Sequence, residues 1–166
     1  SALVLLSPFT PMLFQGQEWG ASTPFQYFTD HDADLGALVS AGRLEEFGGH
    51  GWEDLYGPGF EVPDPQAGAT RDASVLDWNE PDAPGAAAML AFHRSLIDLR
   101  RRHLAAGGLP VAVEDGPDWV ALTHGPLVVT VAARECSAPF RAGEVLAAWG
   151  DAVRDGDEWR LRPGAV

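Results

Sequence analysis

A carboxylate next to an aromatic ring follows the first apolar run of the chain. Residues 12–14 are Met-Leu-Phe, and the polar stretch that comes next contains Glu18 and Trp19. A short apolar run that does not alternate is typical of a strand buried on both faces, and ligand contacts in parallel α/β folds gather where such strands end. Glu18 is therefore a candidate ligand-binding residue. A purely structural hydrogen bond from Glu18 to a neighbouring loop is an equally weighted alternative.

A second group of candidates lies in residues 25–31, where aromatic rings alternate with polar side chains. Rings stack on the apolar faces of sugars, and carboxylate, amide and imidazole groups bond to their hydroxyls. This composition predicts a carbohydrate-binding loop. A packed loop in which Asp30 caps a helix or a turn is the alternative. The polar and aromatic candidates for binding are Gln26, Tyr27, Asp30 and His31.

Three other kinds of chemistry have weaker support. A glycosidase needs two carboxyl groups roughly 5–9.5 Å apart, but the chain has 24 acidic residues, so the presence of candidates means little. Residues 30–32 (Asp-His-Asp) are adjacent, and adjacent residues rarely converge on one metal ion. Cys136 has no motif around it and is expected to be structural. We therefore assign no catalytic residue, no metal ligand and no cofactor.

Composition excludes several classes of partner. The 166 residues carry 11 basic and 24 acidic side chains, a net charge of −13. Such a chain has no basic stripe for a nucleic acid or an anionic membrane. A single cysteine rules out an internal disulfide framework and fits a reducing compartment, so we expect a cytoplasmic protein. No apolar run reaches the length of a membrane span.

The elements that must position these candidates begin with a short helix. The first six residues resemble the end of a buried helix, and we suspect a piece of a longer polypeptide. A buried strand is predicted near residues 11–16. Residues 20–82 are rich in loops but contain many aromatic rings, which predicts an ordered, packed segment. Within it, a helix over residues 34–47 is expected, with Asp32 or Asp34 as its N-cap, and residues 62–66 are expected to be extended.

The clearest helix is predicted over residues 83–104. Proline suits its first turn, and an Asp98–Arg102 pair has the favourable spacing of four. Two glycines at positions 107 and 108 end it. Apolar side chains at helical spacing form one stripe that should be buried: Met89, Phe92, Leu96, Leu99 and His103.

The remainder of the chain is β-rich. Asp155-Gly156 is a hairpin turn signal, and a domain boundary near residue 107 separates this part from the helix. We predict a small antiparallel sheet or sandwich. The predicted strands cover residues 111–113, 119–123, 127–131, 145–149 and 158–162.

Several motifs resemble those of a known family. Residues 7–20 match the Pro-x-Leu-x-x-Gly-x-Glu pattern that marks the eighth barrel strand in the α-amylase clan of glycoside hydrolases. The stretches at residues 22–31, 62–66 and 76–78 narrow the resemblance to the malto-oligosyltrehalose trehalohydrolases. The resemblance is specific up to about residue 104, and it extends to the β-rich tail through architecture more than through motifs.

The resemblance implies an α/β fold: residues 1–107 form the C-terminal end of a (β/α)₈ TIM barrel, and residues 108–166 form a small antiparallel β-sandwich. The implied reaction is retaining hydrolysis of the α-1,4 bond next to the terminal trehalose of maltooligosyl-trehalose. The three family carboxylates precede Ser1, so the chain alone should be inactive. The loop after the barrel strand implies substrate binding by Glu18, Gln26, Tyr27, Asp30 and His31.

Alternative functions remain open. Another clan enzyme, such as a branching or debranching enzyme, would share the barrel motifs. A non-catalytic carbohydrate-binding module could use Trp119, Trp149 and Trp159 as stacking platforms. The expected partners are an α-glucan and the missing N-terminal portion of the barrel.

Overall fold

The computed structural model describes residues 1–47, 57, 61–139 and 143–165. They form two compact units, one made of Ser1–Gly20 with Asn79–Val166 and the other of Ala21–Trp78. The division into these two units does not coincide with the predicted domain boundary near residue 107. That domain boundary stays a prediction. Trp52, Tyr56 and Phe60 of the predicted aromatic loop lie outside the described residues.

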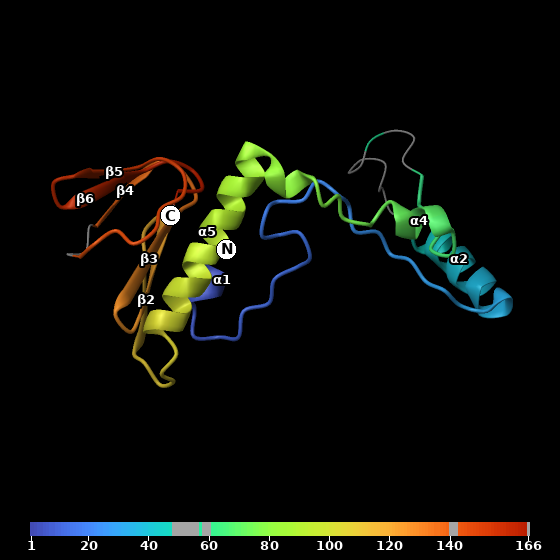
Figure 1. The fold of residues 1–166 in the computed structure, drawn as a ribbon, viewed down its shortest axis with the longest axis horizontal. Helices are drawn as coiled ribbons and strands as arrows, with labels where there is room; N and C mark the ends of the chain where they lie inside the picture. Colours follow the sequence, from blue (N-terminus) through green and yellow to red (C-terminus); the bar gives the residue numbers. More distant parts are fainter. Residues whose placement is uncertain (48–56, 58–60, 140–142, 166) are drawn as a thin grey trace. The chain divides into compact units, whose positions relative to one another are not determined.

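The first unit joins helices to two small antiparallel sheets (Figure 1). Strands β1, β2 and β3 form one sheet in that order, and the other has the order β4-β6-β5. The bounds are α1 Ala2–Leu6, the 3₁₀ helix η1 Glu80–Asp82, α5 Pro84–His103, β1 Val111–Asp115, β2 Trp119–His124, β3 Leu127–Ala132, β4 Cys136–Pro139, β5 Ala152–Asp155 and β6 Glu158–Leu161.

Helix α5 confirms the predicted helix, with Pro84 at its N-terminus. Leu96 and Leu99 are buried as expected, while Met89 and His103 at the ends of the predicted stripe are only half-buried. His93 is buried instead. Helix α5 packs on α1 and on strand β3, and together they enclose one apolar core: Ala2, Leu5, Leu6, Leu96, Leu99, Leu104, Leu127 and Val129.

Four of the five predicted strands are present as β1, β2, β3 and β6. The predicted hairpin is also present: Asp155 pairs with Glu158, and Gly156 takes a φ of 63° in the intervening turn. The predicted strand over residues 145–149 is wrong, because these residues are irregular. Strand β6 already pairs on both sides, with β4 and β5.

The predicted strand near residues 11–16 is also wrong. Residues 11–14 form no ladder and residues 15–20 form turns, while Met12 is 87% exposed. A strand buried on both faces needs neighbouring strands on either side. In the part of the chain that the structure describes, the sheets use only residues between 111 and 161, so nothing is available to pair with this run. The end of a TIM barrel is therefore not seen.

The second unit contains helix α2 (Ala33–Phe47) and helix α4 (Gly68–Asp72), joined to extended segments. Helix α2 confirms the helix predicted over residues 34–47. Its cap is Asp32, whose Oδ1 accepts a hydrogen bond from the Leu35 amide at 3.0 Å. The expectation of packed aromatic rings was wrong for Phe25, which is 56% exposed, and for Trp78, which is 73% exposed.

Candidate functional site

Most of the predicted binding residues lie on one extended segment of the second unit, residues 25–31. The backbone of this segment is held by hydrogen bonds. The Gln26 amide donates to Ser74 Oγ at 3.0 Å, and the Thr29 amide donates to the Pro65 carbonyl at 2.9 Å. Ser74 is buried and in turn donates to the Thr70 carbonyl of helix α4. The segment is therefore held through its main chain at Gln26 and Thr29.

Gln66 provides the densest set of these bonds. Its Oε1 accepts from Thr29 Oγ1 at 2.6 Å and from the His31 amide at 3.2 Å, while its Nε2 donates to the His31 carbonyl at 3.1 Å. The extended conformation predicted over residues 62–66 is wrong for its last two residues, because residues 65–66 form a turn closed by the bond from the Ala67 amide to the Asp64 carbonyl at 3.1 Å. Sequence reasoning did not assign this role to Gln66. The signal was the amide side chain placed directly after Asp-Pro.

Asp64 ties the same segment to helix α2. Its Oδ1 accepts from Ser40 Oγ at 2.5 Å and from the Gln66 amide at 3.0 Å. The bond from Ser40, and then the bond from the Gln66 amide, hold the pKa of the Asp64 carboxyl below its ordinary value. Thr70 Oγ1 also donates to the Asp64 carbonyl at 2.6 Å. Residues 64–66 thus form a junction between the candidate loop and both helices.

The aromatic rings of the loop differ in what covers them. Phe25 and Phe28 meet edge to face with centroids 5.9 Å apart, a favourable arrangement for aromatic pairs. The guanidinium of Arg43 lies 5.2 Å from the centre of the Tyr27 ring and 4.0 Å from that of Phe47. This cation–π contact covers one face of Tyr27, so only the other face is free to stack on a sugar. Sequence reasoning missed Arg43.

Asp30 and His31 are exposed. Among the residues that the structure describes, neither side chain makes a hydrogen bond or an ion pair, although the His31 backbone is bonded on both sides. Asp30 does not cap helix α2, because Asp32 does. Both side chains thus retain their full capacity to bond to a ligand.

Glu18 belongs to the first unit, whereas the other four candidates belong to the second. It lies in the turns of residues 15–20 and is half-buried. The adjacent Trp19 is only 5% exposed, and its Nε1 donates to Glu80 at 3.3 Å. Trp19 is therefore part of the packing and cannot serve as the exposed aromatic platform that the sequence suggested.

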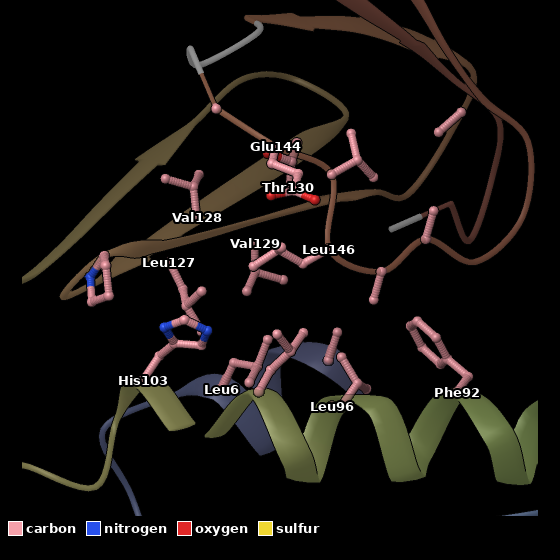
Figure 2. Close-up of a pocket in the computed structure, with 18 of the residues that line it drawn as sticks. Leu6, Phe92, Leu96, His103, Leu127, Val128, Val129, Thr130, Glu144 and Leu146 are labelled. Atoms are coloured by element: carbon pink, nitrogen blue, oxygen red, sulfur yellow. The ribbon is translucent and has the colours of Figure 1, made fainter. Parts of the chain in front are cut away.

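A pocket of about 640 Å³ lies elsewhere in the first unit, between helix α5, strand β3 and residues 143–148. Figure 2 shows Leu96 of α5 facing Val129 of β3 across the pocket, with Phe92 at one end of the pocket and Leu127 toward the other. Its lining is largely apolar and continues the core, and it includes none of the five predicted binding residues. We regard it as a packing feature of this unit.

The remaining candidates carry no chemistry. Cys136 is half-buried, and desolvation, followed by the nearby Asp118 charge, raises the pKa of its thiol. A raised pKa reduces the reactive thiolate, which supports a structural role. Trp119, Trp149 and Trp159 are half-buried, and the Trp149 ring packs 5.4 Å from that of Phe92.

Two negative findings complete the description. Across the described ranges, no three His, Cys, Asp or Glu residues come close enough to hold a metal ion. In the same ranges, no helix combines the length and the apolar character needed to cross a membrane.

Comparison with known proteins confirms the resemblance in the sequence motifs. No family model matches the chain. The chain is 46% identical over 151 residues to a malto-oligosyltrehalose trehalohydrolase from Arthrobacter ramosus, which covers 89% of this chain and 25% of that protein. It is 39% identical over 172 residues to the enzyme of the same name from Rhizobium, covering 98% of this chain and 28% of the relative. The Deinococcus radiodurans protein is 51% identical over 100 residues.

A solved crystal structure agrees with these relatives. A chain from Salmonella typhimurium described as an alpha amylase aligns with 99% of this chain at a TM-score of 0.72 and 32% identity, using 28% of its own length. The chain therefore spans about a quarter of the length of the proteins it matches.

Proposed function

We propose that this chain is the C-terminal part of a malto-oligosyltrehalose trehalohydrolase, given its similarity to a quarter of the length of proteins with that name. The longer protein would hydrolyse the α-1,4 bond next to the terminal trehalose unit of maltooligosyl-trehalose and release trehalose, with retention of configuration. The reaction needs neither a cofactor nor a metal. The three carboxylates that carry it would precede Ser1, and this chain would supply contacts to the sugar.

The proposal assigns residues 1–107 to the end of the catalytic barrel. Three large apolar side chains between residues 9 and 14 support this assignment. Phe9 is 76% exposed, Met12 is 87% exposed and Phe14 is 55% exposed. Exposed apolar side chains that are close in sequence mark a surface that another part of a protein covers. The earlier strands of a barrel would cover them here.

The observation that carries the sugar-binding role is a loop with a fixed backbone on which the Asp30 and His31 side chains make no hydrogen bond or ion pair to any of the described residues. Protein groups that bind sugar hydroxyls must have free hydrogen-bonding capacity and a set position. Gln26 and the open face of Tyr27 complete the proposed contacts of this loop, and Glu18 is proposed separately as a sugar contact of the first unit. The proposal also places the protein in the cytoplasm, in trehalose biosynthesis.

The test is hydrolysis of maltotriosyl-trehalose by the longer protein that contains this segment. Trehalose release is measured for the parent and for the variants Asp30→Ala and His31→Ala. Each variant should raise KM about tenfold, as expected when one charged or polar contact to a ligand is lost. Glu45→Ala is the matched control, because Glu45 is an exposed acidic residue of helix α2 in the same unit.

Other outcomes would favour the alternatives. Transfer of glucan segments without trehalose release would identify a branching enzyme, and release of linear chains from a branched glucan would identify a debranching enzyme. Glucan binding without any hydrolysis would indicate a carbohydrate-binding module.

A further inference from the structure

We propose that Gln66 is a positioning residue for the sugar-binding loop, and that Gly36 is glycine because it must leave room for the Gln66 amide. This inference rests on the proposed function, since it concerns how Asp30 and His31 are held for the substrate. Gln66 itself does not contact the sugar in this proposal. It acts through the backbone of residues 29–31.

The Gln66 side chain makes the same two hydrogen bonds to the His31 backbone that a residue of a neighbouring strand would make. Its amide accepts from the His31 N–H at 3.2 Å and donates to the His31 C=O at 3.1 Å, so both main-chain groups of one residue are satisfied by one side chain. A backbone ladder satisfies these groups in the same way. Thr29 Oγ1 fills the second acceptor site of Oε1 at 2.6 Å.

Helix α2 closes the other side of this amide. Gly36 is buried in the first turns of α2, and a Cβ built on it would lie 2.1 Å from Gln66 Nε2. Glycine inside a helix costs about 1 kcal/mol relative to alanine, so an interior glycine needs a reason. The close approach of the Gln66 amide supplies that reason. The amide is held between the His31 backbone and helix α2.

A methyl group at position 36 would therefore disturb the loop indirectly, by displacing the Gln66 side chain that holds it. The Gln66 side chain is flexible and could swing aside, but it would then lose its bonds to Thr29 and His31. Gly36→Ala thus removes the positioning contact without changing any residue of the loop or Gln66 itself. In a chain that already carries Gln66→Ala, the three atoms nearest to that methyl group, Nε2, Cδ and Cγ of Gln66, are absent.

The experiment compares Gly36→Ala, Gln66→Ala and the double variant in the longer protein, with maltotriosyl-trehalose as substrate. Each single variant should raise KM about tenfold, the effect of a lost hydrogen bond, while kcat stays within about twofold because the reacting carboxylates lie elsewhere. The double variant should resemble either single variant, roughly tenfold rather than a hundredfold. Ala37→Gly, an exposed change at the adjacent position of α2, is the control.

Hydrogen exchange of the His31 amide gives a reading that does not depend on the sugar. It should become faster in both single variants. A normal KM with faster exchange would overturn the positioning role, and so would multiplied effects in the double variant. Slow exchange in Gly36→Ala would overturn the contact itself. If the parent releases no trehalose, the proposed function fails and the sugar-positioning role fails with it, whereas faster exchange would still demonstrate the Gln66 contact.

Discussion

At the scale of single residues, the first unit depends on Arg100 of helix α5, which bonds to carbonyls at the C-terminal end of the short helix α1. Helix α1 has five residues, and the carbonyls at a helix C-terminus have no partner within the helix. Arg100 donates to the carbonyls of Leu5 and Ser7 at 2.8 Å and to that of Phe9 at 2.9 Å. His124 Nδ1 donates to the Leu6 carbonyl at 2.9 Å. Side chains distant in sequence thus complete a helix that is too short to form alone.

Arg100→Ala should lower the free energy of unfolding by about 2–3 kcal/mol, because several carbonyls lose a charged donor together. Urea unfolding followed by circular dichroism measures the change. The matched control is Arg102→Ala on the same helix. Arg102 pairs with Asp98 at 2.6 Å with both side chains more than half exposed, so its loss should cost about 1 kcal/mol or less. Equal effects of the two substitutions would contradict the capping role.

Asp64 makes the second unit sensitive to acid. The bonds from Ser40 and from the Gln66 amide lower the pKa of its carboxyl in the folded state. A lowered folded pKa stabilises the protein above the unfolded pKa, near 4, and the contribution is lost as the pH falls through the folded value. Asp64→Asn keeps an acceptor oxygen but cannot titrate. The parent should therefore be more stable than the variant at pH 7, and this difference should shrink below about pH 4.

The measurement is urea unfolding of the parent and of Asp64→Asn at pH 7, 4 and 2.5. Many other carboxylates titrate in this range, so only the difference between the two proteins is informative. Asp72→Asn serves as a control, because Asp72 is exposed on helix α4 and its carboxylate pairs with the neighbouring, equally exposed Arg71. A difference that stays constant with pH would show that the Asp64 bonds contribute nothing through ionisation.

At the scale of elements, local periodicity correctly predicted the helices and strands that depend mainly on local contacts. Helix α5 has a proline in its first turn and its own apolar stripe, and both are visible in the sequence. The prediction of a strand near residues 11–16 was wrong because a strand forms by pairing with other strands, and local composition alone does not provide that pairing. Residues 145–149 failed for the same reason, since strand β6 had already paired with β4 and β5. His93 was missed because a histidine on an apolar face gives no hydrophobic signal.

The buried face of α5 should be the most sensitive element of the first unit. Leu96 is 2% exposed in the core shared by α1, α5 and β3. Leu96→Ala should cost about 2–5 kcal/mol through lost transfer energy and a residual cavity. Thermal and urea unfolding would measure it. Ser95→Ala on the exposed side of the same turn should change stability by less than about 0.5 kcal/mol. A small loss at Leu96 would mean that the pocket beside it lets the core relax.

The candidate site could be predicted only in part. Aromatic and polar alternation indicated the loop that contains Tyr27, Asp30 and His31, because those residue types bind sugars. The residues that hold the loop were not predictable in the same way. Gln66 and Ser74 lie some 35 and 48 positions away from their partners, and Arg43 reaches Tyr27 from helix α2. Such contacts depend on the tertiary fold, to which a local pattern gives no access.

At the scale of the whole molecule, the comparisons and the exposed apolar side chains lead to the same expectation. The chain matches about a quarter of the length of its relatives. With a net charge of −13, we expect it to bind neither nucleic acids nor anionic surfaces, and a neutral glucan needs no electrostatic steering. In the proposed function this segment supplies sugar contacts without the reacting carboxylates, so it should recognise substrate without converting it.

Residues 1–166 expressed alone should therefore release no trehalose from maltotriosyl-trehalose, whereas the longer protein should. The exposed Phe9, Met12 and Phe14 should also make the isolated segment bind an apolar dye such as ANS. Replacing all three with serine should reduce dye binding by the isolated segment, and in the longer protein it should lower stability, because those side chains would then be buried. Trehalose release by the isolated segment at the rate of the longer protein would disprove the assignment of the catalytic carboxylates to the preceding region. Unchanged stability of the triple variant in the longer protein would show that residues 9–14 do not pack against that region.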